Sequence, residues 1–388
     1  MTCHINLYSI ISAKYVEISF LKNIQYNGRI KRSVLSAKNS TVCGSSYRDL
    51  KNTTKTGERW DYMNKRDKIL TAAGIFTAAA AGFAAYTVKK LCDMAVKAGE
   101  IKFAPSGERI LTGHDPQEVE AIRRESRSKA LACNTERVEI IGSGGLKLVG
   151  HIYPAENQKR ILIAMHGWRS SWTVDFGMSA EFFHQNGCTM IYPDQRGQGE
   201  SEGDYLGFGV LERADCLDWI NYTVERYGDK NPIYLCGVSM GATTVLMTAG
   251  YELPECVKGI IADCGFTSPK DIWQKVMRES FHLKGNIAYA AANYMIQSKA
   301  GYSGDDYSTL DALETDKIPV LFIHGEDDGF VPVEMTRKNY EACRAPKMLL
   351  TVPGADHAMS YMVQKEEYER TVNKFFDCCE GREKFETE

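Results

Sequence analysis

Residues 231–247, with the sequence NPIYLCGVSMGATTVLM, constrain the fold of this 388-residue chain more strongly than any other stretch. The apolar run before Gly237 predicts a buried strand over residues 233–236. The residues after Gly241 are rich in Ala, Leu and Met, which favour a helix. A strand that turns directly into a helix holds the residue between them, Ser239, in a strained backbone conformation and presents its side chain at the end of a sheet.

The two glycines of this turn support the same prediction. A Cβ atom at Gly237 or Gly241 would collide with the neighbouring strand or helix. A Gly-x-Ser-x-Gly pattern alone is weak evidence for a nucleophile, because Gly and Ser are common in loops. Here the strand before it and the helix after it supply the expected context. We therefore predict that Ser239 is a nucleophile, beside a helix N-terminus that favours developing negative charge.

Apolar runs and amphipathic stretches alternate from Arg137 to the end of the chain. The expected strands cover residues 138–141, 146–153, 161–165, 190–192, 233–236, 257–262, 319–323 and 348–352, and the expected helices cover residues 210–227, 242–247, 334–343 and 361–376. The first two strands flank a Gly-rich turn and predict an antiparallel hairpin. The alternation predicts an α/β fold over residues 136–380, with a mostly parallel sheet and helices on both faces.

The interval of about residues 266–317 interrupts this alternation. It contains two helical patterns, over residues 272–281 and 287–297, followed by a loop-like stretch. An insertion at a strand end, above the serine, predicts a helical lid over a pocket. Its aromatic side chains either line an apolar acyl site or simply pack the lid against the body, and they are Trp273, Phe281, Tyr289 and Tyr294.

A nucleophilic serine needs a base and a group that orients the base. His357 lies on the loop after the last predicted strand, and Asp328 follows the strand before it. Their order after Ser239 is one of the known chain orders of a Ser-His-Asp triad. We expect His357 to take the serine proton and Asp328 to fix the histidine tautomer. Asp327 is the rival for the acid, since adjacent residues point to different sides and only one can serve.

A tetrahedral oxyanion needs two N–H donors. We expect one from the backbone of Met240, directly after the serine, and one from the backbone of Trp168, on the loop after the 161–165 strand. His166 and His324 also lie at strand ends. For both we expect a structural or supporting role.

Composition excludes several other functions. The formal net charge is −3, and no strongly basic stretch supports nucleic-acid binding. The 12 cysteines are scattered and lack zinc spacing, and Cys188, Cys236 and Cys264 lie in or beside apolar runs as small buried residues do. We expect neither a metal nor an organic cofactor, because triad chemistry requires neither.

The N-terminal third of the chain lacks the alternation of apolar and amphipathic stretches. Residues 1–62 show no sustained period, which indicates either a disordered extension or a segment absent from a natural protein that starts at Met63. Residues 69–88 contain no charged residue and are about as long as a bilayer-spanning helix, roughly 20 residues. We expect a single-pass anchor in the cell membrane. A cleaved signal peptide and a buried helix of a cytoplasmic protein are the alternatives, and lysines on both sides leave the membrane side undecided.

Residues 89–135 are polar, and we interpret them as a helical connector with a helix over residues 117–132 that begins after Asp115-Pro116.

These features together resemble the α/β-hydrolase superfamily over roughly residues 69–377. The motifs that carry the resemblance are His166-Gly167, Asp194 with Arg196 to Gly199 and Ser201, Gly237 to Gly241, Ile261 to Cys264, His324-Gly325 with Asp328 and Val331-Pro332, and His357 to Tyr361. Within the superfamily the chain is similar to a membrane-anchored bacterial group found in Bacillus and to the serine aminopeptidase-like (S33) hydrolases. The resemblance implies the α/β-hydrolase fold and the triad, and it does not specify a substrate.

We therefore expect a serine hydrolase that acts through an acyl-enzyme, a carboxylesterase on small acyl esters. An aminopeptidase-like peptidase is the alternative, and it would need a lid carboxylate such as Glu279, Asp305 or Asp306 to hold a substrate amine. A thioesterase and a non-catalytic ligand-binding protein of the same fold are also open. The expected partner is a small ester or peptide, and the oligomeric state is open.

Overall fold

The computed structural model describes residues 70, 82, 85–99, 116–280 and 286–386. Its internal contacts divide the chain into two units, Met1–Phe76 and Thr77–Glu388, and every element described below belongs to the second. The predicted extension over residues 1–62 and most of the predicted anchor over residues 69–88 lie outside the described residues. Within the described residues, no helix combines the length and hydropathy that crossing a membrane requires.

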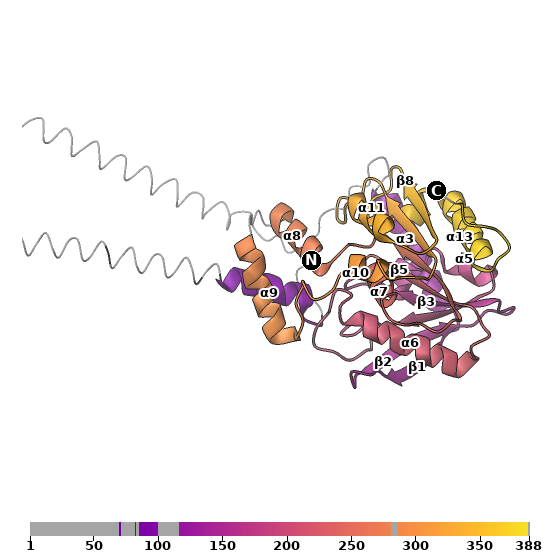
Figure 1. Ribbon diagram of the computed structural model, residues 1–388, viewed down its shortest axis with the longest axis horizontal. Coiled ribbons are helices and arrows are strands. Elements are labelled where there is room, and N and C mark those ends of the chain that lie inside the picture. Colours follow the sequence, from indigo (N-terminus) through magenta and orange to yellow (C-terminus); the bar gives the residue numbers. More distant parts are fainter. Residues whose placement is uncertain (1–69, 71–81, 83–84, 100–115, 281–285, 387–388) are drawn as a thin grey trace, which may run out of the picture. The chain divides into compact units, whose positions relative to one another are not determined.

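An 8-stranded sheet forms the centre of the second unit, with the strand order β1-β2-β4-β3-β5-β6-β7-β8 (Figure 1). Strands β1 and β2 form the predicted antiparallel hairpin, β2 also pairs antiparallel with β4, and the remaining pairs are parallel. The strands are β1 (Glu136–Ile141), β2 (Lys147–Tyr153), β3 (Arg160–Met165), β4 (Cys188–Pro193), β5 (Ile233–Val238), β6 (Val257–Asp263), β7 (Val320–Gly325) and β8 (Lys347–Val352).

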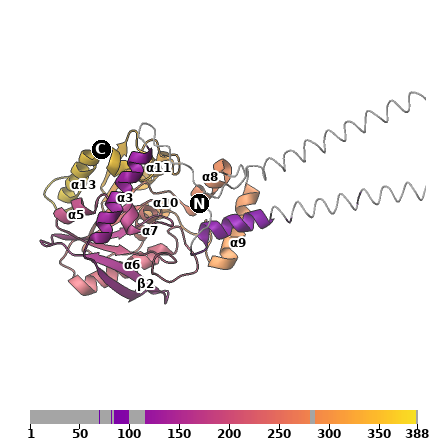
Figure 2. The ribbon, with the colours of Figure 1, turned by 180° about the vertical axis from the view of Figure 1, so that it is seen from behind.

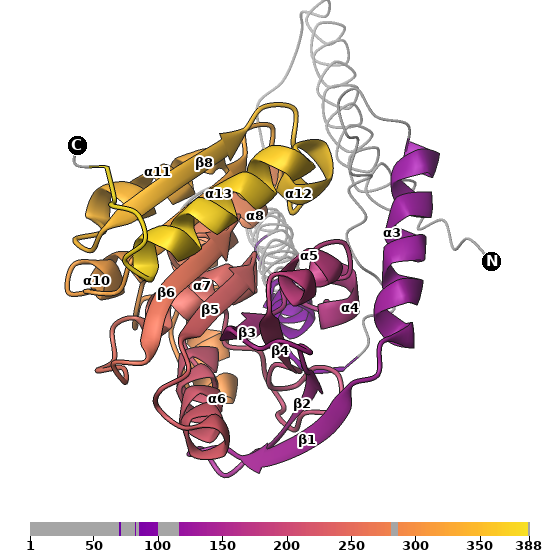
Figure 3. The ribbon, with the colours of Figure 1, turned by 90° about the vertical axis from the view of Figure 1, so that its right-hand side faces the viewer.

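Helices cover both faces of this sheet, as Figure 3 shows for α13 and α5 on one side and α6 on the other. Side chains of α3, α4, α5 and α13 pack into one core, and side chains of α6, α7 and α10 pack into the core on the opposite face. The helices are α3 (Pro116–Ala132), α4 (Trp172–Asp175), α5 (Ala180–Gln185), α6 (Glu212–Tyr227), α7 (Met240–Thr248), α8 (Pro269–Ser280), α9 (Asn286–Ala300), α10 (Thr309–Leu313), α11 (Val333–Ala342), α12 (Ser360–Val363) and α13 (Lys365–Cys379).

The burial of the central strands explains why they could be recognised in the sequence. Every residue of β3, β4, β5 and β7 is buried. Parallel strands with helices on both faces have no solvent side, so they appear in a sequence as continuous apolar runs. The predicted α/β-hydrolase fold, with a mostly parallel sheet between two helical layers, is confirmed.

Several helices differ from the sequence-based expectation. The helix expected over residues 361–376 is divided at Gln364 into α12 and α13. Helices α4, α5 and α10 were not predicted, because 4 to 6 residues contain too little of a helical period to recognise. Helix α3 matches the helix expected within the connector.

A separate apolar core lies at one end of the unit. It joins the helical residues 85–96 to α8 and α9, and we call these three elements the roof. Figures 1 and 2 show α9 crossing residues 85–96 from opposite sides. Cys92 Sγ contacts the Ala292 carbonyl at 3.7 Å, and Lys299 Nζ of α9 lies 2.6 Å from Asp93 Oδ1. In the interval of the expected lid, α8 and α9 belong to the roof, whereas α10 packs against α7 and α11 of the body.

Candidate active site

Ser239 lies at the turn between β5 and α7, in the conformation that the sequence predicted. Its φ is 56° and its ψ is −117°, a region that residues other than Gly adopt only under strain. A Cβ on Gly241 would lie 1.9 Å from the Met165 carbonyl oxygen of β3. A Cβ on Gly237 would lie 2.2 Å from the Gly241 carbonyl oxygen. The turn therefore requires glycine at both positions.

The structure brings together the three residues of the expected triad. Ser239 Oγ lies 2.9 Å from His357 Nε2, and His357 Nδ1 lies 2.7 Å from Asp328 Oδ2. An ionised carboxylate only accepts hydrogen bonds, so Nδ1 carries the proton and Nε2 is free to accept the serine hydroxyl hydrogen. All three residues are buried, whereas the rival acid, Asp327, is exposed.

Asp328 is held as a charged acceptor. Its Oδ1 accepts hydrogen bonds from the backbone N–H groups of Phe330 and Val331, both at 2.8 Å. Burial by itself raises the pKa of this carboxyl, but the neighbouring His357 and His324 outweigh burial and hold the pKa well below its ordinary value. Asp328 is therefore ionised at neutral pH and keeps His357 in the required tautomer.

Of the other two strand-end histidines, His324 contacts Asp328, and His166 contacts the loop after β4. His324 Nε2 lies 3.1 Å from Asp328 Oδ2 and 2.8 Å from the Val331 carbonyl oxygen. His166 accepts a hydrogen bond from the Gln195 backbone N–H at Nε2, over 3.2 Å. Both rings are fully buried.

Asp356 is a member of the site that the sequence did not indicate. Its Oδ1 accepts hydrogen bonds from the backbone N–H groups of His357, at 2.7 Å, and Gly329, at 3.1 Å. The carboxylate thus joins the loop of the histidine to the loop of Asp328. Because its partners are backbone groups, only the position of Asp356 beside His357 could have drawn attention to it.

The loop expected to supply an oxyanion donor runs next to the serine. A Cβ on Gly167 would lie 3.3 Å from Ser239 Cβ. The Gly167 N–H donates to Asp175 Oδ2 over 2.6 Å, which fixes the loop. Among the described residues, the backbone N–H groups of Trp168 and Met240 have no hydrogen-bond acceptor. Both are thus free to donate to an oxyanion.

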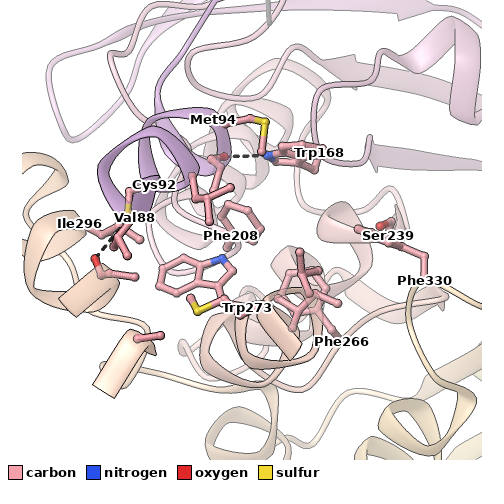
Figure 4. Close-up of a pocket in the computed structure, with 17 residues that line it drawn as sticks. Val88, Cys92, Met94, Trp168, Phe208, Ser239, Phe266, Trp273, Ile296 and Phe330 are labelled. Carbon is pink, nitrogen blue, oxygen red and sulfur yellow. Dashed lines mark hydrogen bonds between the residues drawn. The ribbon is translucent and has the colours of Figure 1, made fainter. Parts of the chain in front are cut away.

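Ser239 faces an apolar cavity of about 110 Å³ (Figure 4). Except for Ser239, the residues that line it are apolar or aromatic. They come from the body, from both lid helices and from residues 85–96, and they are Val88, Leu91, Cys92, Met94, Ala95, Trp168, Phe208, Phe266, Ile272, Trp273, Val276, Met277, Ala288, Ala292, Ile296 and Phe330. A ligand with an acyl or other apolar group next to a reactive carbonyl fits such a wall.

The lid aromatics are divided in their roles. Trp273 lines the cavity, as one interpretation expected. Tyr289 is buried, but its hydroxyl donates to Asp305 Oδ2 over 2.7 Å, and Tyr294 is 73% exposed. Neither lines the cavity: Tyr289 packs within the roof, as the alternative interpretation expected, and only Tyr294 points away into solvent. Phe281 lies outside the described residues.

The three lid carboxylates do not line this cavity. Glu279 pairs with Lys275 at 2.8 Å, and Asp305 pairs with Lys270 at 2.7 Å. Asp306 accepts a hydrogen bond from the backbone N–H of Ser303. The carboxylate that an aminopeptidase was expected to place in the lid is therefore not provided at Ser239 by any of them.

Two groups of the described residues have side chains of metal-binding type within reach of one another. The first is Cys264 with Asp328 and His357, in which the carboxylate and the imidazole already bind each other. The second is His151 with Asp194 and Glu200, where Asp194 Oδ2 accepts the Glu200 backbone N–H. The chemistry proposed for the serine requires no metal at either group.

Comparison with known proteins agrees with the geometry. The model of the prolyl oligopeptidase family matches residues 174–382. The uncharacterized protein YqkD of Bacillus subtilis is 29% identical over 230 residues, which cover 58% of this chain and 74% of YqkD. The bifunctional esterase/perhydrolase DCH of Acinetobacter calcoaceticus is 22% identical over 241 residues, which cover 51% of this chain and 85% of DCH.

A solved structure shows the same fold. The esterase of Pyrococcus furiosus superposes with a TM-score of 0.54 at 24% identity, over 64% of this chain and 92% of the esterase. The family model covers more than half of the 388 residues. The chain therefore belongs to the prolyl oligopeptidase family and has the α/β-hydrolase fold.

Proposed function

We propose that the protein is a serine carboxylesterase that cleaves esters of short to medium acyl chains through an acyl-enzyme on Ser239. The observation that carries this proposal is the hydroxyl itself. It is bonded to His357 within the buried Asp328–His357 pair, and it opens onto a cavity whose other walls are apolar. An ester places its carbonyl at such a hydroxyl and its acyl chain against such a wall.

The steps follow from the contacts. His357 Nε2 takes the Ser239 proton while Oγ attacks the ester carbonyl, and the resulting oxyanion accepts hydrogen bonds from the Met240 and Trp168 backbone N–H groups. The protonated imidazole then gives its proton to the departing alcohol. A water molecule, deprotonated by the same nitrogen, attacks the acyl-enzyme, and the imidazolium returns this proton to Ser239 Oγ as the acid is released. Asp328 stabilises the imidazolium at both stages.

A peptidase is the second candidate, and the family match is the observation that favours it. The cavity does not favour it, because the described residues that line it include no charged group to hold a peptide terminus. A thioester is attacked by the same chemistry, so a thioesterase differs from our proposal only in the leaving group.

The test is covalent labelling combined with three substrate classes. The full-length chain and its Ser239→Ala variant are treated with a fluorophosphonate, and p-nitrophenyl esters, aminoacyl p-nitroanilides and acyl thioesters are assayed in parallel. We expect labelling and ester cleavage in the wild type, and loss of both in the variant by about 10⁴-fold or more in kcat. Cleavage restricted to anilides or to thioesters would move the assignment to that class. Absence of labelling in the folded protein would favour a non-catalytic binding role.

We also keep membrane attachment as a proposal. It is supported by the sequence of residues 69–88, which lack charged residues over a length suited to a bilayer. The native protein should then sediment with membranes, and alkaline carbonate washing should not release it. Recovery in the soluble fraction would contradict the proposal.

A further inference from the structure

Residues 85–96 are an unexpected part of the site. The sequence placed them partly in an anchor and partly in a connector, but Val88, Leu91, Cys92, Met94 and Ala95 all line the cavity at Ser239 (Figure 4). Cys92 is 3% exposed, and the other four residues are half-buried. The helix therefore forms a wall of the cavity.

The turn that carries the candidate oxyanion donor holds the end of this helix. Trp168 Nε1 donates to the Ala95 carbonyl oxygen over 2.8 Å. The Arg169 guanidinium donates to the carbonyl oxygens of Met94, at 2.9 Å, Lys97, at 2.5 Å, and Gly99, at 2.5 Å. The last carbonyls of a helix have no partner within it and carry partial negative charge, so a guanidinium is a favourable partner there.

Arg169 has a φ of 51°, which an arginine adopts only when its surroundings hold it. The peptide bond between Trp168 and Arg169 leads into this strained residue, and Trp168 is the residue expected to supply an oxyanion donor. The contacts that hold the Arg169 side chain therefore also fix the backbone of Trp168. Its guanidinium also lies 5.3 Å from the centre of the Trp168 ring, which joins the two side chains into one unit.

Independent contacts fix the position of the helix. The Leu206 N–H donates to the Val96 carbonyl oxygen over 2.7 Å, and the Ala98 N–H donates to the Asp204 carbonyl oxygen over 2.8 Å. Residues 96–98 thus pair with a loop of the body. The ion pair between Asp93 and Lys299 joins the helix to the lid.

We propose that residues 85–96 are part of the acyl-binding site. In this arrangement the helix side chains limit the length of the acyl chain. The carbonyls of Met94, Lys97 and Gly99, at and just after the end of the helix, position the Trp168 N–H through Arg169, which makes Arg169 a positioning residue. The inference rests on the proposed esterase function.

The first experiment measures acyl-chain preference in the full-length protein. Ala95→Leu narrows the cavity, Leu91→Ala widens it, and Ala121→Leu on the exposed face of α3 is the matched control. The substrates are p-nitrophenyl acetate, butyrate, octanoate and laurate. We expect Ala95→Leu to lower kcat/KM for the longest ester about 10-fold relative to acetate, and Leu91→Ala to shift the preference the other way. A preference unchanged in both variants would overturn the acyl-site assignment.

The second experiment separates positioning from binding. Arg169→Ala removes all three carbonyl contacts, Arg169→Lys keeps a charge that reaches fewer of them, and Arg226→Ala removes an arginine from an exposed pair with Glu136 as the control. We expect kcat to fall roughly 10- to 100-fold in Arg169→Ala for every ester alike, with little change in KM and an intermediate value for Arg169→Lys.

The outcomes distinguish this inference from the proposed function. Fluorophosphonate labelling of wild-type Ser239 tests the function, and it is scored first. With labelling established, a kcat in Arg169→Ala equal to that of the wild type would overturn the positioning role. Should Arg169→Ala fail to fold, Arg169→Lys provides the same measurement, and a wild-type kcat in that variant, at unchanged thermal stability, would likewise count against the role.

Discussion

The body and the roof meet at Ser239, but different interactions hold them. In the body, the polar groups of the site are buried and paired, from Ser239 to His357 to Asp328 and on to two backbone N–H groups. In the roof, the cavity-facing side chains are apolar. The indole N–H of Trp273 is buried there without an acceptor among the described residues.

This difference separates two tasks. A buried polar network works only when every member is present in its place, because one missing partner leaves another group unpaired in a low dielectric. An apolar wall tolerates exchanges that conserve volume. The body therefore fixes the chemistry, while the roof sets which ligands fit and can change at lower cost.

The sharpest test of the body is Asp328→Asn. The amide leaves the geometry nearly intact but favours the wrong histidine tautomer, so we expect kcat to fall about 10⁴-fold. The control is Asp327→Asn, one residue away and exposed, which should retain wild-type turnover. Similar losses in both variants would mean that the acid has been assigned to the wrong residue of the pair.

A second test concerns how tightly the body is packed at the turn between β5 and α7. Gly241→Ala places a Cβ 1.9 Å from the Met165 carbonyl oxygen, a backbone atom that cannot move alone. We expect the free energy of unfolding to fall by about 3 kcal/mol. Gly144→Ala has open space around the new methyl group, so it should change stability by less than about 0.5 kcal/mol in the same urea titrations. Equal stability of the two variants would show that the turn between β5 and α7 has room for a methyl group at Gly241.

A third test uses Asp263, a buried carboxyl of the body that the proposed mechanism leaves unused. Burial raises its pKa to about 7, against the attraction of His324. The folded protein thus keeps this proton up to about pH 7, whereas the unfolded chain loses it near pH 4. The free energy of unfolding of the wild type therefore falls as the pH rises from about 4 to about 7.

Asp263→Asn removes that dependence. Relative to the wild type, we expect the free energy of unfolding of the variant to rise by at least about 1.4 kcal/mol from pH 5 to pH 8, which corresponds to a shift of one pKa unit. Urea unfolding at the two pH values measures it, with Asp327→Asn as the exposed control. A constant difference across this range would mean that Asp263 is ionised in the folded body.

The smallest effect is expected in the roof. Lys299→Ala breaks the ion pair with Asp93, whose two side chains are 33% and 26% exposed. Such pairs contribute less than about 1 kcal/mol, and their effect weakens with salt. Unfolding in low and high salt checks this value. A loss of several kcal/mol would show that charge, and not apolar packing, holds the roof together.

The body and the roof also differ in how well their structure could be predicted from the sequence. The body could be predicted because its signals are local: continuous apolar runs for β3, β5 and β7, and two glycines around Ser239. The triad followed, because each member lies just after a predicted strand and parallel strands bring their ends to one edge.

The lining of the cavity was less predictable. Tyr289, Ala292 and Ile296 are buried, and their spacing of three and four residues marks one face of α9, from which Tyr294 points away. That periodicity was available in the sequence and would have excluded Tyr294. Phe208 and Phe330 lie on loops, where no period indicates their direction. The uncharged run before residue 89 suggested a membrane segment, and no local pattern reveals that its continuation packs against Trp168.

The hydrogen bonds from Arg169 to the backbone of residues 94–99 have a consequence for how the sequences of this family can diverge. Its partners are main-chain oxygens, which every amino acid carries, so a change of side chain at Met94 or Lys97 leaves the contact in place, whereas Gly99, with a φ of 97°, favours glycine. Only insertions and deletions, which shift the register, would break it. Relatives could therefore keep these contacts although the side chains of this segment differ. In an alignment, we expect a constant spacing between the segment and the loop of Arg169, without a matched pair of side chains.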